Sequence, residues 1–268
     1  MAKNKIIASI IIPTFNRPEQ IKETIKSIKD NKFPKEKFEI IIIDDGSKED
    51  YSKTISQLKK KYSNIKYYKN KKNLGPSSSR NKGISISKGE IILFTDDDCI
   101  VPKNWVKTYV DFLEKNKKVA GVGGCTTPSS ENLVGKIERL KEKILKINVS
   151  EIKIGKEEIP TGFTGNMSYR KKILKEFKGF NEKLKRGEDM DLKERISKKY
   201  SLAAHPLLVI HKHDFNFDYL LSRIIKEGLD TQPSGGKFKK TWIIISRSPK
   251  MIYKVIKKTI KYRKNAKQ

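Results

Sequence analysis

Apolar residues occur along the chain in short, nearly continuous runs, and the segments beside these runs have helical spacing. Three runs rich in Ile come early, and they are Ile6–Ile12, Phe38–Ile43 and Glu90–Thr95. Strands that are apolar at successive positions are typical of a parallel sheet covered on both faces. The segments with the apolar spacing of amphipathic helices are Glu19–Ile28, Tyr51–Tyr62 and Asn104–Glu114. This alternation predicts a succession of βαβ units.

Polar residues follow each run at the point where the strand is expected to end. The first run leads into Thr14 and its neighbours, the second into Asp44-Asp45, and the third into Asp96–Asp98. In an open α/β sheet, ligands bind beside the carboxyl ends of the strands. We therefore expect these three groups to converge on one edge of the sheet. Glycine dipeptides, Gly123-Gly124 among them, are predicted in the turns.

The second half of the chain has a different pattern. It contains a charged amphipathic stretch, Asn132–Lys146, a predicted helix at about Met190–Lys198, and an apolar strand, Leu207–Ile210. Residues 237–268 then hold twelve Lys or Arg and no acid. We predict one domain over residues 1–236, with a nucleotide-binding half (1–124) and an acceptor-side half (125–236). A basic helical appendage is predicted over residues 237–268.

The net charge of the chain indicates that its binding partners are anionic. The chain has 60 Lys and Arg against 31 Asp and Glu, a net charge of +29, which attracts phosphates on nucleotides, nucleic acids or anionic lipids. Its two cysteines, Cys99 and Cys125, are too few for a disulfide framework and lack a metal-ligand spacing. They favour a reducing cytoplasm. No segment approaches the ~18 apolar residues that a membrane-spanning helix needs, and the short run Ile6–Ile12 indicates a strand rather than a signal peptide.

Two acidic segments are candidates for chemistry. Asp96, Asp97 and Asp98 concentrate negative charge, which cations or hydrogen-bond donors must offset. A hard divalent cation, Mn²⁺ or Mg²⁺, held by one or two carboxylates and by substrate phosphates would do so. Alternatively, one Asp caps the following helix and the others are solvated. The second segment, DDGS at 44–47, equally fits an Asx turn that leads into a helix.

Four segments gain weight when they are taken in order. They are SIIIPTFNRPEQIKETIKSI, EIIIIDDGSKED, NLGPSSSRNKGISISKGEIILFTDDDCIVPKNW and TGFTGNMSYRKKILKEFKGFNEKLKRGEDMDLKERI. In this combination the chain resembles family 2 glycosyltransferases, the large inverting group with the GT-A fold, from about Ile6 to about Gly228. The resemblance implies an α/β fold with a Rossmann-like, mixed but mostly parallel sheet flanked by helices.

The same resemblance implies a set of donor-binding residues. They are Pro13, Thr14, Asn16, Arg17, Asp44, Asp45, Arg80, Asp96, Asp97, Gly165 and Asn166. Asp45, or its neighbour Asp44, would contact the base. Gly165 would allow close backbone approach beneath the donor sugar. It and Asn166 also fit a simple turn before the strand Met167–Tyr169.

Metal and catalytic roles follow from the resemblance as well. Asp98 would reach a metal on the diphosphate, with Asp96 and His211 as further ligands, although His213 competes with His211. Asp189 resembles the family's catalytic base, and Glu188 the residue that contacts the acceptor. From the residues alone, Asp189 also fits an acid stabilised by the dipole at a helix N-terminus.

The implied reaction moves a sugar, with inversion, from a nucleoside-diphosphate donor to an acceptor hydroxyl on a glycan or lipid-linked molecule. UDP-sugars are favoured, with GDP-sugars next. A sugar nucleotidyltransferase is one alternative, but the chain has no Gly-rich phosphate loop near its first strand. A nucleic-acid-binding protein is another, although no recognised nucleic-acid motif accompanies the charge. A donor-binding protein without activity is disfavoured because Asp98, Glu188 and Asp189 are present.

The basic appendage has its own pattern. Residues 249–264 have helical spacing, with Lys on one side and a broad apolar face on the other, which consists of Met251, Ile252, Val255, Ile256 and Ile260. Such a helix suits an anionic membrane surface. It would equally suit packing on the catalytic domain with solvated lysines. We therefore expect a cytoplasmic protein with peripheral attachment to the inner face of the cell membrane.

Overall fold

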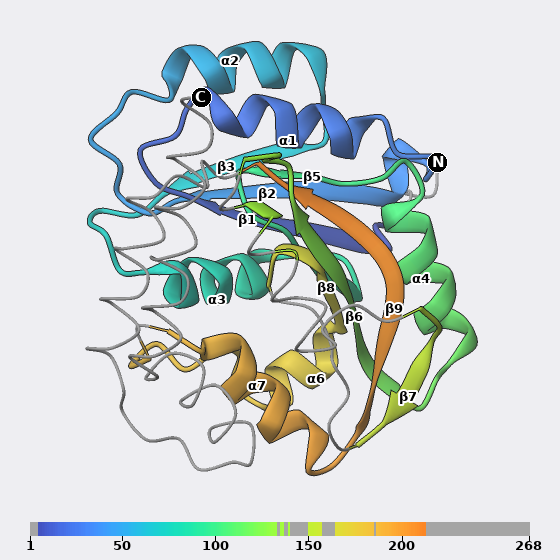
Figure 1. Ribbon diagram of the computed structural model, residues 1–268. Helices are drawn as coiled ribbons and strands as arrows, with labels where there is room; N and C mark the ends of the chain where they lie inside the picture. Colours follow the sequence, from blue (N-terminus) through green and yellow to red (C-terminus); the bar gives the residue numbers. More distant parts are fainter. Residues whose placement is uncertain are drawn as a thin grey trace, which may run out of the picture. The chain divides into compact units, whose positions relative to one another are not determined.

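The computed structural model describes residues 5–132, 135–136, 139, 150–156, 164–184 and 186–212. They all belong to one compact unit, Met1–His213. Within it, helices flank a curled sheet on both sides (Figure 1). Among the described residues, no helix combines the length and the apolar character needed to cross a bilayer. The predicted appendage, His213, the boundary at residue 236 and most of the predicted stretch Asn132–Lys146 lie outside the described residues.

The three Ile-rich runs form the central strands, as predicted. They are β1 (Ala8–Thr14), β2 (Phe38–Asp44) and β4 (Ile91–Phe94). The three predicted helices are also confirmed, as α1 (Gln20–Lys29), α2 (Ser52–Lys61) and α4 (Trp105–Lys115). Every residue of β2 is buried because helices cover both faces of the sheet, which accounts for its unbroken apolar sequence.

The second half adds further strands and helices. They are β5 (Cys99–Ile100), β6 (Val119–Pro128), β7 (Lys153–Gly155), β8 (Met167–Arg170), α6 (Lys171–Glu176), α7 (Glu188–Ser197) and β9 (Ser201–His211). The predicted strand near Leu207–Ile210 is thus part of a longer one. The sequence pattern did not predict β3 (Ile65–Lys69) or α3 (Pro76–Ile86), and short 3-10 turns occur at Lys35–Lys37 and Thr164–Asn166.

The sheet is mixed but mostly parallel, in agreement with the predicted fold class. In the described part of the chain it has nine strands, in the order β3-β2-β1-β4-β8-β6-β9-β5, and β7 pairs with β9. Strand β8 runs antiparallel to β4 and β6, while β6 and β9 are parallel. Thr14 pairs with Asp44, and Ile11 pairs with Phe94, so the carboxyl ends of β1, β2 and β4 share one edge.

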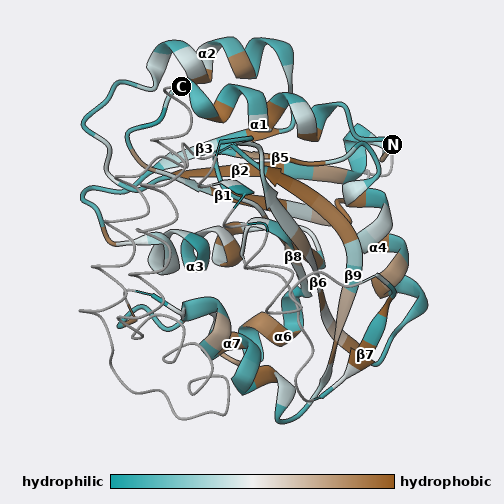
Figure 2. Cartoon of the chain, in the orientation of Figure 1, coloured by the Kyte–Doolittle hydropathy of each residue, from teal (hydrophilic) through white to brown (hydrophobic). Residues whose placement is uncertain are grey.

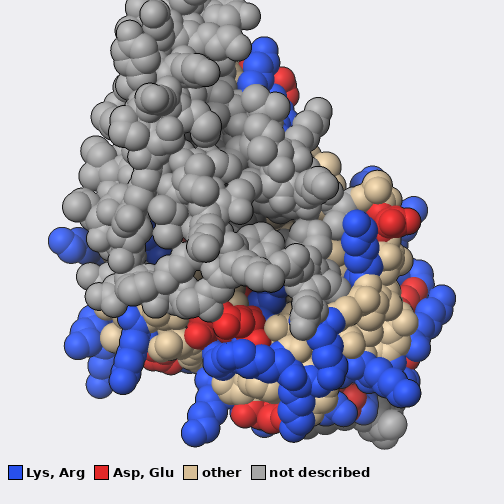
Figure 3. Space-filling view, turned by 60° about the horizontal axis from the view of Figure 1, so that its bottom comes forward, with Lys and Arg blue, Asp and Glu red and all other residues tan. Residues whose placement is uncertain are grey.

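Two apolar layers hold the sheet between the helices. One layer contains Ile10 and Ile12 with residues of α1, α2 and α4, and the other contains Ile11 with residues of α3, α6 and α7. Figure 2 shows the brown strands inside and the polar outer faces of the helices. On the described part of the face seen in Figure 3, Lys and Arg are more abundant than Asp and Glu, which form smaller groups.

The prediction of a turn at Gly123-Gly124 is wrong, because both residues lie inside β6. A β-carbon on Gly124 would come within 2.4 Å of the Leu207 carbonyl oxygen and of the Tyr109 hydroxyl. Close approach of β9 and α4 explains the glycine better than a turn does. The pairing of β6 with β9 also shifts register between Gly123 and Cys125. One sheet therefore continues across the predicted division at residue 124.

Candidate functional site

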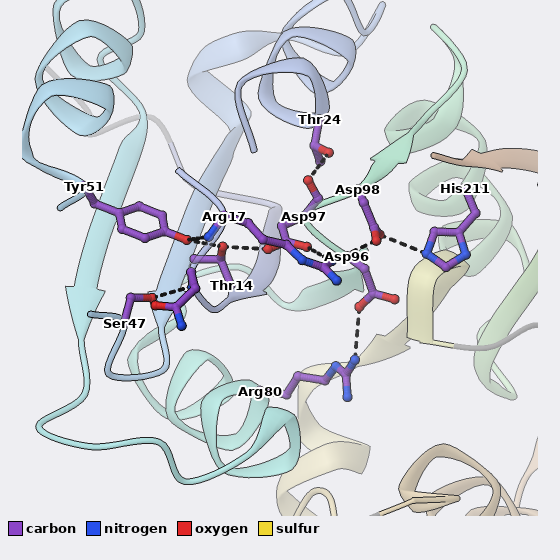
Figure 4. A network of polar contacts seen from close by, with 11 residues as sticks. Thr14, Arg17, Thr24, Ser47, Tyr51, Arg80, Asp96, Asp97, Asp98 and His211 are labelled. Carbon is purple, nitrogen blue, oxygen red and sulfur yellow. Dashed lines mark hydrogen bonds and ion pairs between the residues drawn. The ribbon is translucent and has the colours of Figure 1, made fainter. Parts of the chain in front are cut away.

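The ends of β1 and β4 meet in a buried polar network (Figure 4). The hydroxyl of Thr14 donates to Oδ2 of Asp97 at 2.6 Å and shares a hydrogen bond of 2.8 Å with the hydroxyl of Tyr51. Thr24 on α1 donates to the backbone carbonyl of Asp97 at 2.9 Å. The parallel register of β1 and β4 places these polar ends together, as the sequence predicts.

Arg17 supplies positive charge to this network. Its Nη1 donates to Oδ1 of Asp97 at 3.1 Å and to Oδ2 of Asp98 at 2.9 Å. Burial raises the pKa of Asp97 to about 6, an effect that Thr14 and Arg17 oppose and the neighbouring carboxylates reinforce. Asp97 is only 5% exposed. The side chain of Arg17 is 37% exposed, so this cation remains accessible to a ligand at the edge of the sheet.

Asp98, Cys99 and His211 form a compact group of metal-ligating side chains. Nε2 of His211 lies 2.9 Å from Oδ1 of Asp98. Burial lowers the pKa of His211, but its hydrogen bond with Asp98 and the charge of that carboxylate outweigh the effect, so the net shift is upward. Burial, reinforced by the charges of Asp96 and Asp98, raises the pKa of the Cys99 thiol.

The donor set of this group fits a divalent cation. One ligand atom each from Asp98, Cys99 and His211 lies within 4.8 Å of the other two. A carboxylate, an imidazole and a thiol are ligand types that divalent transition metals accept, and Arg17 offsets part of the charge of the Asp98 carboxylate. The structure thus brings together two of the predicted ligands, Asp98 and His211. The third, Asp96, is not part of the group and is bonded to Arg80 instead.

Arg80 links this edge to the predicted catalytic pair. From α3, its Nη2 donates to Asp96 at 3.0 Å and its Nη1 donates to Glu188 at 2.8 Å. The side chain of Arg80 is 5% exposed, whereas that of Asp96 is 31% exposed, so the guanidinium is buried and one of its two partners faces solvent in part. Glu188 is the first residue of α7, and Asp189 follows it. One guanidinium therefore joins Asp96, which follows β4, to Glu188 at the start of α7.

Asp189 has the electrostatics of a poised carboxylate. Burial and the charge of Glu188 raise its pKa to about 6, against the opposing charge of Arg80 and a hydrogen bond from the Met190 amide. It lies in the first turn of α7, where the helix dipole favours an anion. The alternative expectation of a helix N-terminal acid therefore describes its position, but a raised pKa also suits an acid–base role.

Asp44 and Asp45 are engaged by the protein itself. Asp44 is fully buried, and its carboxylate accepts from the Ser47 amide at 2.8 Å and the Tyr67 hydroxyl at 2.6 Å. This is the turn that the alternative interpretation of DDGS predicted. Asp45 accepts from the Gly75 amide at 2.7 Å, at the start of α3, and from Ser79 at 3.0 Å. Base contact through Asp44 finds no support in this arrangement.

Asn166 is likewise part of the core. It is fully buried, and its Oδ1 accepts from Trp105 at 2.8 Å and from Tyr109 at 2.6 Å. Its Nδ2 donates to the carbonyls of Cys125 and Leu207 at 2.7 and 2.9 Å. All four hydrogen-bonding positions of the amide are thus used within the protein. A direct donor contact through this side chain is not supported by the geometry.

The remaining predicted residues border the same edge. Pro13 is half-buried in β1. Asn16 is exposed and has a positive φ of 54°. It joins the loops after β1 and β2, because its backbone amide donates to the hydroxyl of Ser47 at 2.8 Å. Gly165 lies beside Asp96, since a β-carbon there would be 3.3 Å from Oδ2 of that residue. The backbone carbonyl of Gly165 accepts from the Thr95 hydroxyl at 3.0 Å.

Sequence reasoning missed two members of the site. The sequence predicts Tyr51 only as the start of a helix, yet its hydroxyl contacts both Thr14 and the backbone amide of Arg17, the latter at 2.8 Å. Cys99 has no ligand spacing in the sequence, yet its Sγ lies within 4.8 Å of ligand atoms of Asp98 and His211. It is the cross-strand partner of His211. Its position directly after the three aspartates is the one signal that could have identified it. Both cysteines are buried.

The fold and the polar edge define an α/β protein with a candidate metal centre at the carboxyl ends of parallel strands. The sequence profile of Glycosyl transferase family 2 matches residues 9–178. An uncharacterized glycosyltransferase of Methanocaldococcus jannaschii is 33% identical over 232 residues, which are 84% of this chain and 77% of that protein. The chain therefore belongs to glycosyltransferase family 2.

Other relatives are longer than this chain. The poly(ribitol-phosphate) beta-glucosyltransferase of Bacillus spizizenii is 35% identical over 129 residues, which are 46% of this chain and 20% of that protein. The crystal structure of Staphylococcus aureus TarS 1-349 in complex with UDP superposes with a TM-score of 0.62 at 20% identity, covering 86% of this chain and 67% of that one. This likeness establishes the GT-A fold.

Proposed function

We propose that this chain transfers a sugar from a nucleoside-diphosphate donor to an acceptor hydroxyl, with inversion at the anomeric carbon. The observation that carries the proposal is the pair of contacts made by Arg80, at 3.0 Å to Asp96 and 2.8 Å to Glu188. These contacts join one acid expected to bind the donor, Asp96, to one expected to contact the acceptor, Glu188. Membership of family 2 supports the same activity.

The donor would lie along the ends of β1 and β4. Arg17 would contact the diphosphate, and the loops held together by Asn16 and Ser47 would lie beside the nucleoside. Asp98 and His211 would hold a divalent cation, Mn²⁺ or Mg²⁺, which supplies charge neutralisation for the departing diphosphate. UDP-sugars are the first choice of donor, on the family resemblance, with GDP-sugars next.

Asp189 would act as the general base. A sugar hydroxyl is a weak nucleophile, so a carboxylate within hydrogen-bond reach accepts its proton as the bond to the anomeric carbon forms. The bond between that carbon and the diphosphate oxygen breaks on the opposite face, which inverts the configuration. The proton moves to Asp189, and the electron pair of the broken bond leaves with the nucleoside diphosphate.

A donor panel tests the proposal. Full-length protein is incubated with UDP- and GDP-sugars and glycan or lipid-linked acceptors, with Mn²⁺, Mg²⁺ or a chelator, and nucleoside-diphosphate release is measured. We expect release with one donor class, its loss in chelator, and a ~10²- to 10⁴-fold lower rate in Asp189→Asn. Glu194→Gln, an exposed acid on the same helix, is the matched control and should retain the rate. Release that is equal in Asp189→Asn and in wild type would remove Asp189 from the role of base.

The acceptor and the location belong to the same proposal. We infer a glycan or lipid-linked acceptor, and peripheral attachment of a cytoplasmic enzyme to an anionic membrane through residues 237–268. The support is the sequence pattern of that segment, with twelve cations and no acid. Neither alternative function gains a specific observation, since the nucleotidyltransferase lacks its phosphate loop and nucleic-acid binding rests on charge alone.

A further inference from the structure

The candidate metal centre contains a sulfur atom that the proposed reaction does not require. Cys99 and His211 are direct partners in the antiparallel pairing of β5 and β9. Residues opposite each other in such a pair project their side chains from the same face of the sheet. The thiol, the imidazole and the carboxylate of Asp98 thereby present three ligand atoms within 4.8 Å of one another.

The surrounding residues hold the thiol in this place. Cys99 is 1% exposed. A β-carbon on Gly165 would meet Sγ of Cys99 and Oδ2 of Asp96 at 3.3 Å each, so the thiol and this carboxylate lie together beneath a residue without a side chain. The carboxylates of Asp96 and Asp98 lie beside the thiol, and each is also bonded to an arginine, Asp96 to Arg80 and Asp98 to Arg17. Cys99 also packs in the apolar core, so its thiol lies where that core meets these carboxylates.

One oxygen, one nitrogen and one sulfur donor form a set that hard cations do not favour. Mg²⁺ is bound in proteins almost entirely by oxygen, whereas Zn²⁺ and Co²⁺ accept imidazole and thiolate together. Ligand atoms of a tetrahedral zinc site are about 3 to 4 Å apart, given Zn–N and Zn–S bonds of ~2.0 and ~2.3 Å. The three atoms here lie within 4.8 Å of one another, and Nε2 of His211 is 2.9 Å from Oδ1 of Asp98, so a cation would replace the hydrogen bond between these two. Such a site leaves a fourth position open.

We propose that Asp98, Cys99 and His211 bind a thiophilic divalent cation, with Zn²⁺ as the representative, in the absence of nucleotide. Binding replaces the thiol proton, which passes to solvent, and a thiolate–metal bond forms without a change of oxidation state. One part of this proposal rests on the proposed function: the thiophilic cation would occupy the same site as the metal that binds the donor diphosphate. From this it follows that Zn²⁺ and Mn²⁺ compete for one site, and that Zn²⁺ is held by one more protein ligand.

Cobalt titration tests the site without donor, acceptor or turnover. Co²⁺ is added to the full-length, metal-free protein, and absorption is recorded. We expect a sulfur-to-cobalt charge-transfer band in the near ultraviolet and the intense visible bands of a tetrahedral ion, both removed by stoichiometric Zn²⁺. Cys99→Ser should lose the charge-transfer band and bind ~10- to 100-fold more weakly or worse. The matched control is Cys125→Ser, which replaces the other buried cysteine and should keep the band.

Two results would overturn the proposal: a wild-type spectrum without the sulfur band, or a band that persists in Cys99→Ser. Circular dichroism checks the fold of each variant. If Cys99→Ser does not fold, His211→Gln keeps both cysteines and must still weaken cobalt binding to a similar extent. Failure of the proposed glycosyl transfer is separate, since it is measured by nucleoside-diphosphate release in Asp189→Asn, a residue outside this group of ligands.

Discussion

Three consecutive aspartates at the end of β4 have different partners and therefore different properties. Asp96 is bonded to Arg80, whereas Asp98 lies beside His211. Asp97 lies between them, and burial raises its pKa to about 6. Asp96 is thus paired with an arginine of α3, Asp97 belongs to a buried hydrogen-bond network, and Asp98 is a candidate metal ligand. The differences come from residues far away in the chain.

Replacement of Asp98 tests the metal role at the scale of one residue. Calorimetry of UDP or GDP binding in Mn²⁺ should show the metal-dependent part of the affinity reduced by ~10- to 100-fold in Asp98→Ala, because the cation loses a ligand with negative charge. Asp111→Ala is a matched control, since this acid pairs with Lys107 on the surface of α4. Metal-dependent binding equal to wild type in Asp98→Ala would exclude Asp98 as a ligand.

The pH dependence of transfer follows from Asp189. Its pKa is raised to about 6, and a general base acts in its deprotonated form. The active fraction therefore increases as pH rises through about 6 and falls about tenfold per unit below it. We expect the rate of nucleoside-diphosphate release at saturating donor and acceptor to show this acid limb. A rate that rises as pH falls from 7 to 5 contradicts the assignment.

At the scale of elements, the sequence predicts strands well and cross-strand neighbours poorly. Unbroken Ile runs identify β1, β2 and β4 because burial on both faces demands apolar residues at every position. Convergence of the strand ends follows from parallel pairing alone. The proximity of Cys99 to His211 depends on the antiparallel pairing of β5 with β9. Because β5 has only two residues, its sequence is too short to predict this pairing.

The same limit applies to Asn166 and Gly124. Asn166 looks like a turn residue in sequence, but side chains from α4 and carbonyls of two strands saturate its amide. Gly124 looks like a turn glycine, but it is a contact between β6 and its neighbours. Both features depend on residues that approach from other elements, so no local pattern predicts them. Together they fix β6, β9 and α4 around the second half of the sheet.

A substitution of Gly124 tests this packing. Gly124→Ala places a methyl group 2.4 Å from the Leu207 carbonyl and 2.5 Å from Nδ2 of Asn166. Overpacking of this kind costs about 1–3 kcal/mol, so the free energy of unfolding in urea should fall by that amount. Thr127→Ala on the same strand, where the side chain is only half-buried, should change it by less. Equal stability of Gly124→Ala and wild type would contradict the close approach.

At the scale of the whole molecule, positive charge is abundant, but we expect only part of it to contribute to specific membrane attachment. The net charge is +29, and Lys and Arg side chains outnumber acidic ones on the described part of the face in Figure 3. A general excess of charge attracts any polyanion, and salt weakens that attraction. Specific membrane attachment needs apolar side chains to accompany the lysines. The sequence predicts such a combination for residues 249–264. The effect of this segment on membrane binding can therefore be separated by experiment from the effect of total charge.

The separation uses variants of equal charge in the full-length chain. Lys254, Lys257 and Lys261 of the basic segment are replaced by Gln, and a second variant carries the same change at Lys53, Lys59 and Lys60, exposed residues in α2. Each cation near an anionic surface contributes about 1 kcal/mol, so the first variant should bind anionic vesicles ~100-fold more weakly in sedimentation. The second should bind nearly as wild type, and neither should bind neutral vesicles. Equal losses in the two variants would mean that total charge, rather than the C-terminal segment, attracts this protein to the membrane.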